Sequence, residues 1–588
     1  MFRPHAFALL VTLSLLPLTT LPAQRRAAPP SPRVARLLRT LTVRQQVAQL
    51  VMPWLAGSYA AFDDRALDRA RGWVDSLEVG GIIISIGSPL DLAAKLNFLQ
   101  RRSRLPLLVA SDLEGGTAIR FTGGTPFPTN MGVGATRSEM DAWRMGRITA
   151  LEGRAAGVHL TFSPVADVNN NPENPIINTR SFGGDPEMVG RFVAATVRGI
   201  QSAGMLATIK HFPGHGDTDT DSHLSLPVIR ASYGRLDSLE LIPFRAGIAA
   251  GVSTVMSAHI ALPDLVDQDS VPATLAPEIL TGLLRDSLGF RGLVVTDALD
   301  MGALVTSYGP GEAAVRAFLA GSDLLLMPAD PRAAIDAMTV AVLEGRVPRA
   351  RLRASVRRML EIKERLRLFQ RRTVNLDSVG YVIGRRAHRD SARAVSARAL
   401  VLVRDSLGVM DSLRARPGRV ALVSYADASG GTVGQTLGAE LGRRGYQLRT
   451  FRLGTASGPA SYDSAAVVAA GAPLTVFVTS IRIADRRGPI GLPAPLAELI
   501  DRSSRERPTL LISLGTPYLI KQVPNVPGYL LGWTANPIVE DAVAAALAGA
   551  PITGRLPIDL PPGYVMGHGL VKDGQASDGR TARRPNGR

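Results

Sequence analysis

The sequence of 588 residues contains no cysteine. This absence excludes disulfides, thiolate catalysis, cysteine-ligated zinc and a lipid-modified cysteine. Lysine is also scarce, with five lysines among 67 basic residues, and aromatic residues make up 5% of the chain. The net charge of +17 therefore comes from arginines, which are interleaved with acidic residues and form no lysine-rich runs or aromatic stacking motifs. We interpret the charge as a solvated basic surface and expect no nucleic-acid partner; attraction to an anionic cell-wall polymer stays open.

Long apolar runs are missing except near the N-terminus. Residues 1–23 combine an early arginine, an apolar run from Ala6 to Leu21 and small residues before a proline-rich spacer. This layout predicts a secretory signal peptide cleaved near Ala23. An uncleaved membrane anchor is the weaker alternative, because Pro17 interrupts a run that is already short for a span. We therefore expect an exported protein, periplasmic or secreted, without stable membrane insertion after cleavage.

Short apolar runs alternate with helix-length segments over residues 34–370. Such runs predict parallel strands buried on both faces, the first within 46–53, and about eight βα units indicate an α/β fold of the (β/α)8 TIM-like barrel type. An arginine-rich linker follows at 371–398. A second set of apolar runs predicts a C-terminal α/β domain, doubly wound or a sandwich, at 399–570. Residues 571–588 have almost no apolar side chains and are expected to form a disordered tail.

Ionisable residues end several of the predicted barrel strands. In a parallel barrel these strand ends converge on one rim, so residues far apart in the sequence would face a single pocket. The alternative is that each polar residue merely ends its strand. That alternative accounts for one or two such residues more easily than for six. The pattern therefore favours an enzyme, with these strand-end residues: Asp112, Asp167, Lys210, His211, His259 and Asp297.

The stretch "KHFPGHGDTDTDSH", from Lys210 to His223, contains three of the eight histidines. Its glycines and proline predict a loop that follows the strand ending at Lys210 and His211. Asp221 and His223 are two positions apart, which places them on one face of an extended segment and favours a general acid/base pair. A metal site is the rival interpretation, but the chain lacks HExxH and an EF-hand order of acidic residues. We expect no metal, and no phosphate loop, because GxxxxGK[ST] is also missing.

Three further motifs carry charged residues beside glycines or apolar runs. In "SDLEGGTAIRF", Asp112 and Arg120 flank two glycines, and "NTRSFGGDP" supplies Arg180 in a turn-rich loop. A carboxylate and a guanidinium can bracket neighbouring hydroxyl groups, although each arginine could instead form a salt bridge at the rim. In "VVTDALDM", Asp297 directly follows a buried run, where a carboxylate can act as a nucleophile, while Asp300 could cap a helix.

These four motifs, in their order along the chain, resemble the β-N-acetylhexosaminidase branch of glycoside hydrolase family 3. The resemblance covers the barrel and, more loosely, the second domain. It implies that Asp297 is the nucleophile of a retaining glycosidase and that His223, paired with Asp221, is the acid/base. It also implies that no cofactor is needed, and that the terminal sugar is bound by Asp112, Arg120, Arg180, Lys210 and His211.

The expected function is removal of terminal β-linked N-acetylglucosamine from cell-wall muropeptides or chito-oligosaccharides by an exo-acting hydrolase. Three alternatives stay open at this point: a β-N-acetylglucosaminide phosphorylase, a β-glucosidase of the same family, and a non-catalytic carbohydrate-binding protein. Asp297 together with the pair Asp221 and His223 favours an enzyme, because a binding protein needs neither a nucleophile nor an acid/base.

Overall fold

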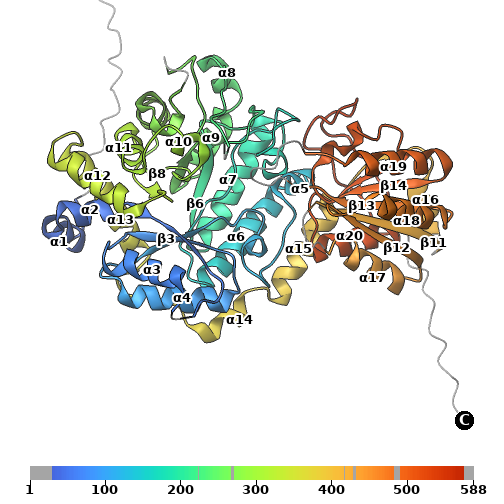
Figure 1. Cartoon of the computed structure of the whole chain (residues 1–588), viewed down its shortest axis with the longest axis horizontal. Helices are drawn as coiled ribbons and strands as arrows, with labels where there is room; N and C mark the ends of the chain where they lie inside the picture. Colours follow the sequence, from blue (N-terminus) through green and yellow to red (C-terminus); the bar gives the residue numbers. More distant parts are fainter. Residues whose placement is uncertain are drawn as a thin grey trace, which may run out of the picture.

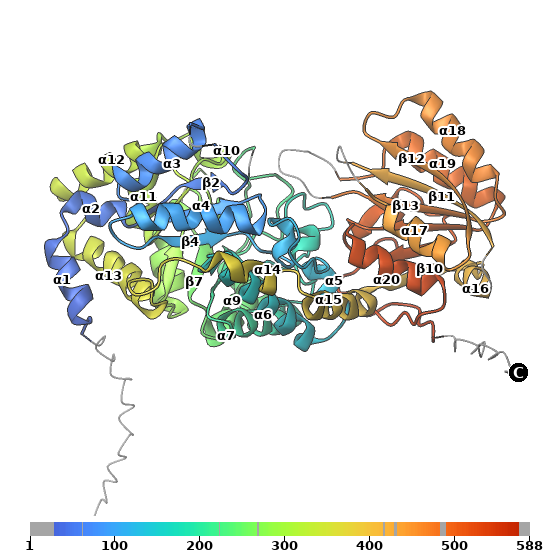
Figure 2. The ribbon, with the colours of Figure 1, turned by 90° about the horizontal axis from the view of Figure 1, so that it is seen from below.

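The chain forms two bodies in the computed structural model, with helix α15 (Arg386–Ala399) between them (Figures 1 and 2). The predicted signal peptide and His223 lie outside the described residues. None of the described helices is long and apolar enough to cross a membrane. The structure describes residues 29–61, 63–222, 224–266, 270–415, 418–427, 432–482 and 490–574.

The N-terminal body is a closed ring of parallel strands. Within the described residues, one sheet has the order β2-β3-β4-β5-β6-β7-β8, and β1 pairs with β9. The ring closes because β1 and β2 are consecutive segments separated by Pro53, while Val295 at the end of β8 bridges to Leu324 beside β9. With β1 and β2 taken as one strand, the described residues form the predicted (β/α)8 barrel. The strands are β1 (Val51–Met52), β2 (Trp54–Ala56), β3 (Gly81–Ser85), β4 (Leu108–Ser111), β5 (Leu160–Thr161), β6 (Leu206–Phe212), β7 (Thr254–Ser257), β8 (Leu293–Val295) and β9 (Leu325–Leu326).

Helices surround the barrel strands, and several of them begin at side-chain caps. Ser88 caps α4, and Asp185 caps α7 by accepting two backbone N–H groups, with proline in the first turn of both helices. These caps satisfy amides that have no partner inside a helix. The helices of this body are α1 (Pro32–Thr40), α2 (Val43–Ala48), α3 (Arg65–Asp75), α4 (Pro89–Arg102), α5 (Asn130–Ala135), α6 (Glu139–Ala155), α7 (Pro186–Ser202), α8 (Tyr233–Ser238), α9 (Leu241–Ala249), the π-helix η4 (Glu278–Ser287), α10 (Gly302–Val305), α11 (Pro310–Ala320), α12 (Pro331–Leu343) and α13 (Arg349–Arg365).

The first strand begins later than the sequence predicted. Most of the segment expected as a strand at 46–53 belongs to helix α2 and the turn after it. Thr42 and Gln45 form a capping box, in which each side chain accepts the backbone N–H of the other residue. The predicted start was too early, because a short apolar run fits a buried helix face as well as a strand, and the cap decides for the helix.

The C-terminal body is a sheet between two helix layers, which confirms the predicted α/β sandwich. Its strand order is β10-β15-β14-β13-β11-β12 within the described residues, and β10 is antiparallel to β15 while the other pairs are parallel. Helices α18 and α19 cover one face, and α16, α17 and α20 cover the other. Strand β10 was not predicted. The elements are β10 (Val401–Asp405), α16 (Val409–Ala415), β11 (Arg419–Ala426), α17 (Gln435–Arg443), β12 (Gln447–Gly454), α18 (Pro459–Ala470), β13 (Thr475–Ser480), α19 (Ala494–Glu506), β14 (Thr509–Ser513), η6 (Pro517–Lys521), β15 (Gly528–Leu531) and α20 (Pro537–Leu547).

Residues 371–398, expected as a linker, contain α14 (Val379–Val382) and most of α15. Helix α15 contacts both bodies. Its Arg398 donates hydrogen bonds of 2.7 and 2.9 Å to the buried Asp141 of α6, and the helix packs against α20 of the second domain. At the other end, residues 571–574 lie against the second domain, because Lys572 pairs with Ile552. The rest of the expected tail lies outside the described residues.

Candidate active site

Polar side chains from different strands meet at the C-terminal rim of the barrel. Asp112 follows β4 and Lys210 lies in β6, 98 positions away, yet their side chains are joined by a hydrogen bond of 2.9 Å. The ammonium group of Lys210 also lies 2.6 Å from Oε1 of Glu114. Two predicted site residues are therefore in contact, and Glu114, an acidic residue that the prediction did not select, joins them.

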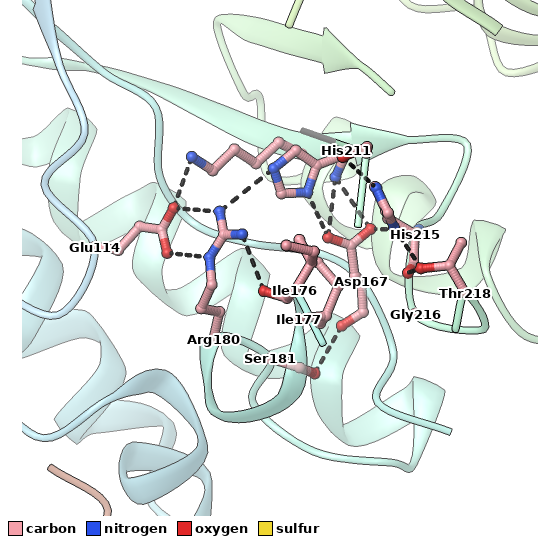
Figure 3. Close-up of polar contacts among 12 residues, drawn as sticks. Glu114, Asp167, Ile176, Ile177, Arg180, Ser181, His211, His215, Gly216 and Thr218 are labelled. Atoms are coloured by element: carbon pink, nitrogen blue, oxygen red, sulfur yellow. Dashed lines mark hydrogen bonds and ion pairs between the residues drawn. The ribbon is translucent and has the colours of Figure 1, made fainter. Parts of the chain in front are cut away.

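The carboxylate of Glu114 binds both Arg180 and Lys210. Arg180 donates two parallel hydrogen bonds to its carboxylate, of 2.9 and 3.0 Å, as Figure 3 shows. Burial by itself would raise the pKa of Glu114, but the charges and hydrogen bonds of Arg180 and Lys210 hold this pKa well below its usual range. Burial disfavours the charged form of Lys210, but Asp112 and Glu114 raise its pKa above the ordinary value. Glu114, Arg180 and Lys210 are therefore charged groups that can bind polar ligand atoms.

Asp167 organises the other side of the cluster. Its completely buried carboxylate contacts Nδ1 of His211 at 2.7 Å and accepts the backbone N–H groups of His211 and His215 (Figure 3). Nη2 of Arg180 lies 3.4 Å from Nε2 of the same His211. Asp167 was recognised as a strand-end residue but not as a site residue. Its strand-end position was the signal that could have identified it.

His215 anchors the loop after β6. Its Nδ1 contacts the hydroxyl of Thr218 at 2.9 Å, and its Nε2 contacts the hydroxyl of Ser222 at 3.2 Å. Burial and the neighbouring His211 lower the pKa of His215 to about 4, so its imidazole is neutral at pH 7. Among the described residues, no group of three or more histidine and acidic side chains is arranged to hold a metal ion.

Asp297 follows β8 at the same rim, and its Oδ1 accepts the N–H of Ala298 at 2.8 Å. Burial by itself would raise its pKa, but the charges of His211, His259 and Lys210 and this hydrogen bond lower the pKa to about 2. His259, at the end of β7, also donates to the carbonyl of Ala298 at 2.9 Å. The carboxylate of Asp297 is thus ionised at every ordinary pH and available as a nucleophile.

The remaining predicted residues have different outcomes. Asp221 is buried, and Ser222 beside it accepts the N–H of Ala303 at 3.3 Å, which connects this loop to the segment after β8. His223 lies outside the described residues. The carbonyl oxygen of Arg120 accepts the N–H of Gly87, two residues after β3. Its Nε is buried and has no hydrogen-bond partner among the described residues, and no salt bridge among them joins Arg120 to Asp112. The structure thus brings together Asp112, Arg180, Lys210, His211 and Asp297.

Comparisons with known proteins agree with this geometry. Residues 42–362 match the family model described as the glycosyl hydrolase family 3 N terminal domain. The β-N-acetylglucosaminidase/β-glucosidase of Cellulomonas fimi is 32% identical over 82% of this chain and 89% of its own length. A solved family 3 β-N-acetylglucosaminidase from Paenibacillus sp. str. FPU-7 is 34% identical, with a TM-score of 0.79 over 88% of this chain and 99% of that chain.

A solved β-glucoside phosphorylase is also similar, at 27% identity and a TM-score of 0.81 over 90% of this chain and 96% of that chain. These similarities cover both bodies, so the barrel and the second domain occur together in the relatives. With an ionised carboxylate at the barrel rim and a matching family model over more than half of its length, the chain belongs to glycoside hydrolase family 3 and is a glycoside hydrolase.

Proposed function

We propose that the enzyme is an exported, retaining exo-β-N-acetylglucosaminidase. The observation that carries the proposal is Asp297, whose carboxylate stays ionised on the rim that also holds the cluster of Asp112, Glu114, Arg180 and Lys210. Such a cluster suits the hydroxyl groups of one terminal sugar, because it offers both donors and acceptors. The printed names of the similar Cellulomonas and Paenibacillus enzymes support N-acetylglucosamine as that sugar.

The proposed reaction has two steps. In the first, an oxygen of Asp297 bonds to the anomeric carbon, the glycosidic C–O bond breaks, and the leaving oxygen takes a proton from His223. In the second, water gives a proton to His223 and attacks the anomeric carbon, which releases Asp297. Asp221 holds the imidazole of His223 in the orientation needed for both transfers. The contact between His215 and Ser222 supports this assignment, because it holds the residue directly after Asp221 in place.

Binding roles follow from the same cluster. We assign Asp112, Arg180, Lys210 and His211 to the terminal sugar, with Arg120 beside them. The substrate we propose is a cell-wall muropeptide or a chito-oligosaccharide, and the site of action is the periplasm or the medium. The apolar run within residues 1–23 supports export.

Phosphorolysis is a second candidate, favoured by the similarity to the solved β-glucoside phosphorylase. A neutral imidazole repels an incoming phosphate less than a carboxylate acid/base does. In that case phosphate replaces water in the second step and the product is a sugar 1-phosphate.

One assay tests the proposal and its alternatives. Chromogenic β-N-acetylglucosaminide and β-glucoside are compared side by side, with and without phosphate, for the wild type and Asp297→Asn. We expect the wild type to prefer the N-acetylglucosaminide independently of phosphate, and the variant to lose turnover. A preference for the glucoside refutes the substrate class, acceleration by phosphate with release of a sugar 1-phosphate refutes hydrolysis, and undiminished turnover by the variant refutes the nucleophile assignment.

A further inference from the structure

Helix α6 carries a buried carboxylate that the proposed reaction does not use. Glu152, in α6, is completely buried. Its Oε1 accepts hydrogen bonds from the hydroxyl of Thr125 at 2.5 Å, the N–H of Gly384 at 2.9 Å and Nδ1 of His388 at 2.7 Å. Its Oε2 accepts the N–H of Thr125 at 3.0 Å and the hydroxyl of Thr117. One carboxylate therefore joins three separate parts of the chain.

The contacts of His388 define which nitrogen donates to Glu152. Nε of Arg385 lies 2.9 Å from Nε2 of His388. A guanidinium can only donate, so Nε2 is the acceptor and the proton of a neutral imidazole is on Nδ1. Burial by itself would raise the pKa of Glu152, but the hydrogen bonds from His388, Thr117 and Thr125 lower it below the usual value. An ionised carboxylate thus receives all of these donors.

Two of the donors enclose the loop that follows Glu114. Thr117 and Thr125 are separated by the segment that contains Arg120, and the ends of this segment are held together by a bridge between Gly116 and Pro126. Both threonines are completely buried. Glu152 therefore holds both ends of residues 115–127, here called the sugar-site loop.

The linker contacts the same loop directly. Gly384 has φ of +63°, and a Cβ added there would lie 2.3 Å from the carbonyl oxygen of Gly123. A separation this short is not possible for a real side chain, so the linker backbone lies against the sugar-site loop only because residue 384 is glycine. Gly384 lies just before α15 and His388 lies in the first turn of that helix, which packs against α20 of the second domain (Figure 2).

We propose that Glu152 is a positioning residue for the sugar-site loop, and that the linker residues Gly384 and His388 make the attachment of the second domain part of what holds that loop in place. This inference rests on the proposed function in one respect, because it assigns the loop after Glu114 to the binding of the terminal sugar. Through this attachment the second domain contributes to the affinity for the sugar, although it does not need to contact the reacting atoms.

Two variants test the inference by different chemistry. Glu152→Gln keeps the shape but places an amide NH2 against at least one backbone N–H, of Thr125 or of Gly384, in either orientation of the amide. Gly384→Ala keeps every hydrogen-bonding group and forces the linker away from Gly123. The matched controls are Asp323→Asn, a buried carboxylate bound by Arg285, and Gly289→Ala, where φ is +68° and no atom lies within 4 Å of an added Cβ.

The first readout is steady-state kinetics with the chromogenic N-acetylglucosaminide at a temperature where all variants are folded. We expect both test variants to raise KM about tenfold and to change kcat less than about threefold, because the loop binds parts of the sugar that do not react. The controls should leave KM within about twofold of the wild type. An unchanged KM in both test variants, or an equal rise in the controls, overturns the inference.

The second readout needs no activity and separates this inference from the proposed function. Hydrogen exchange of the backbone amides in residues 115–127 should become at least about tenfold faster in both test variants and not in the controls. If the wild type does not cleave the N-acetylglucosaminide and this exchange still increases, the positioning role stands and the proposed function fails. If cleavage is normal and exchange does not change, the positioning role fails alone.

Discussion

Lys363 allows a prediction whose size follows from the structure. Its side chain is completely buried in α13, and its ammonium group donates a hydrogen bond of 2.7 Å to Oε1 of Gln49. Burial, with a smaller effect of the charge of Arg372, lowers its pKa from 10.5 to about 7. At about 1.4 kcal/mol for each pKa unit, this corresponds to roughly 5 kcal/mol of unfavourable free energy below pH 7.

The sign follows from the protons bound in each state. Between pH 7 and 10.5 the unfolded chain keeps the lysine proton while the folded protein releases it, so the free energy of unfolding rises with pH by up to about 1.4 kcal/mol per unit. The cost of burying Lys363 is therefore roughly 4 kcal/mol at pH 7 and roughly 2 kcal/mol at pH 9.

Lys363→Met removes this cost but leaves Oε1 of Gln49 without its donor, which costs about 1–3 kcal/mol. We expect the variant to be more stable than the wild type by about 1–3 kcal/mol at pH 7, and this advantage to decrease by about 2 kcal/mol at pH 9. Urea unfolding at pH 7, 8 and 9 and constant ionic strength, followed by tryptophan fluorescence, measures the difference. Three of the four tryptophans, Trp54, Trp73 and Trp143, lie in the barrel.

Lys521→Met is the matched control, because that side chain is exposed on η6 and pairs with Glu173 at the surface. Its stability difference from the wild type should be nearly the same at each pH. A constant difference between Lys363→Met and the wild type across the three pH values, or one that grows with pH, would refute the reasoning.

Three further predictions concern the active site. Asp297→Asn should lower kcat by about 10³-fold or more while KM stays within a few-fold, and single-turnover assays that show normal formation of a glycosyl-enzyme would contradict this. Lys210→Met should lower kcat/KM by about 10²-fold, because Asp112 and Glu114 lose the cation that they share. The pH profile of kcat/KM should show that the pKa of Asp297 moves upward, and an unchanged pH profile would contradict the charge effect. Asp221→Asn should lower kcat by about 10²-fold for poor leaving groups and much less for a nitrophenolate, which needs little protonation. Equal losses for both leaving groups would remove Asp221 from the proton-transfer step.

The sequence predicted the parts of the fold that depend on local pattern. Every residue of β3 and β6 is buried and most of these residues are apolar, and the alternation of such runs with helix-length segments indicated the barrel. Helix α2 was mistaken for part of a strand, because a short apolar run has no distinct period. Strand β10 was not found, because its short apolar run follows α15 directly and no turn residue separates the two.

The contact between Asp112 and Lys210 could also be expected, since parallel strands of a barrel end at one rim. The partners of Glu114 and Asp167 could not be predicted from the sequence. Both are acidic residues beside predicted site residues, and which cation or amide each one binds depends on the paths of loops that the sequence pattern does not describe. The buried position of Asp221 likewise follows from the loop that His215 anchors.

The sequence by itself thus determined the fold class and the strand ends that carry the chemistry, because apolar periodicity and the residue at the end of a run are local properties. Only the tertiary structure decided the protonation states of Asp297 and Lys363, and the attachment of the sugar-site loop to the linker through Glu152. These depend on burial and on partners far apart in the chain, such as Glu152 and His388, which are 236 positions apart. Electrostatic energies in a protein interior depend on distance in space, and separation along the chain does not reveal that distance.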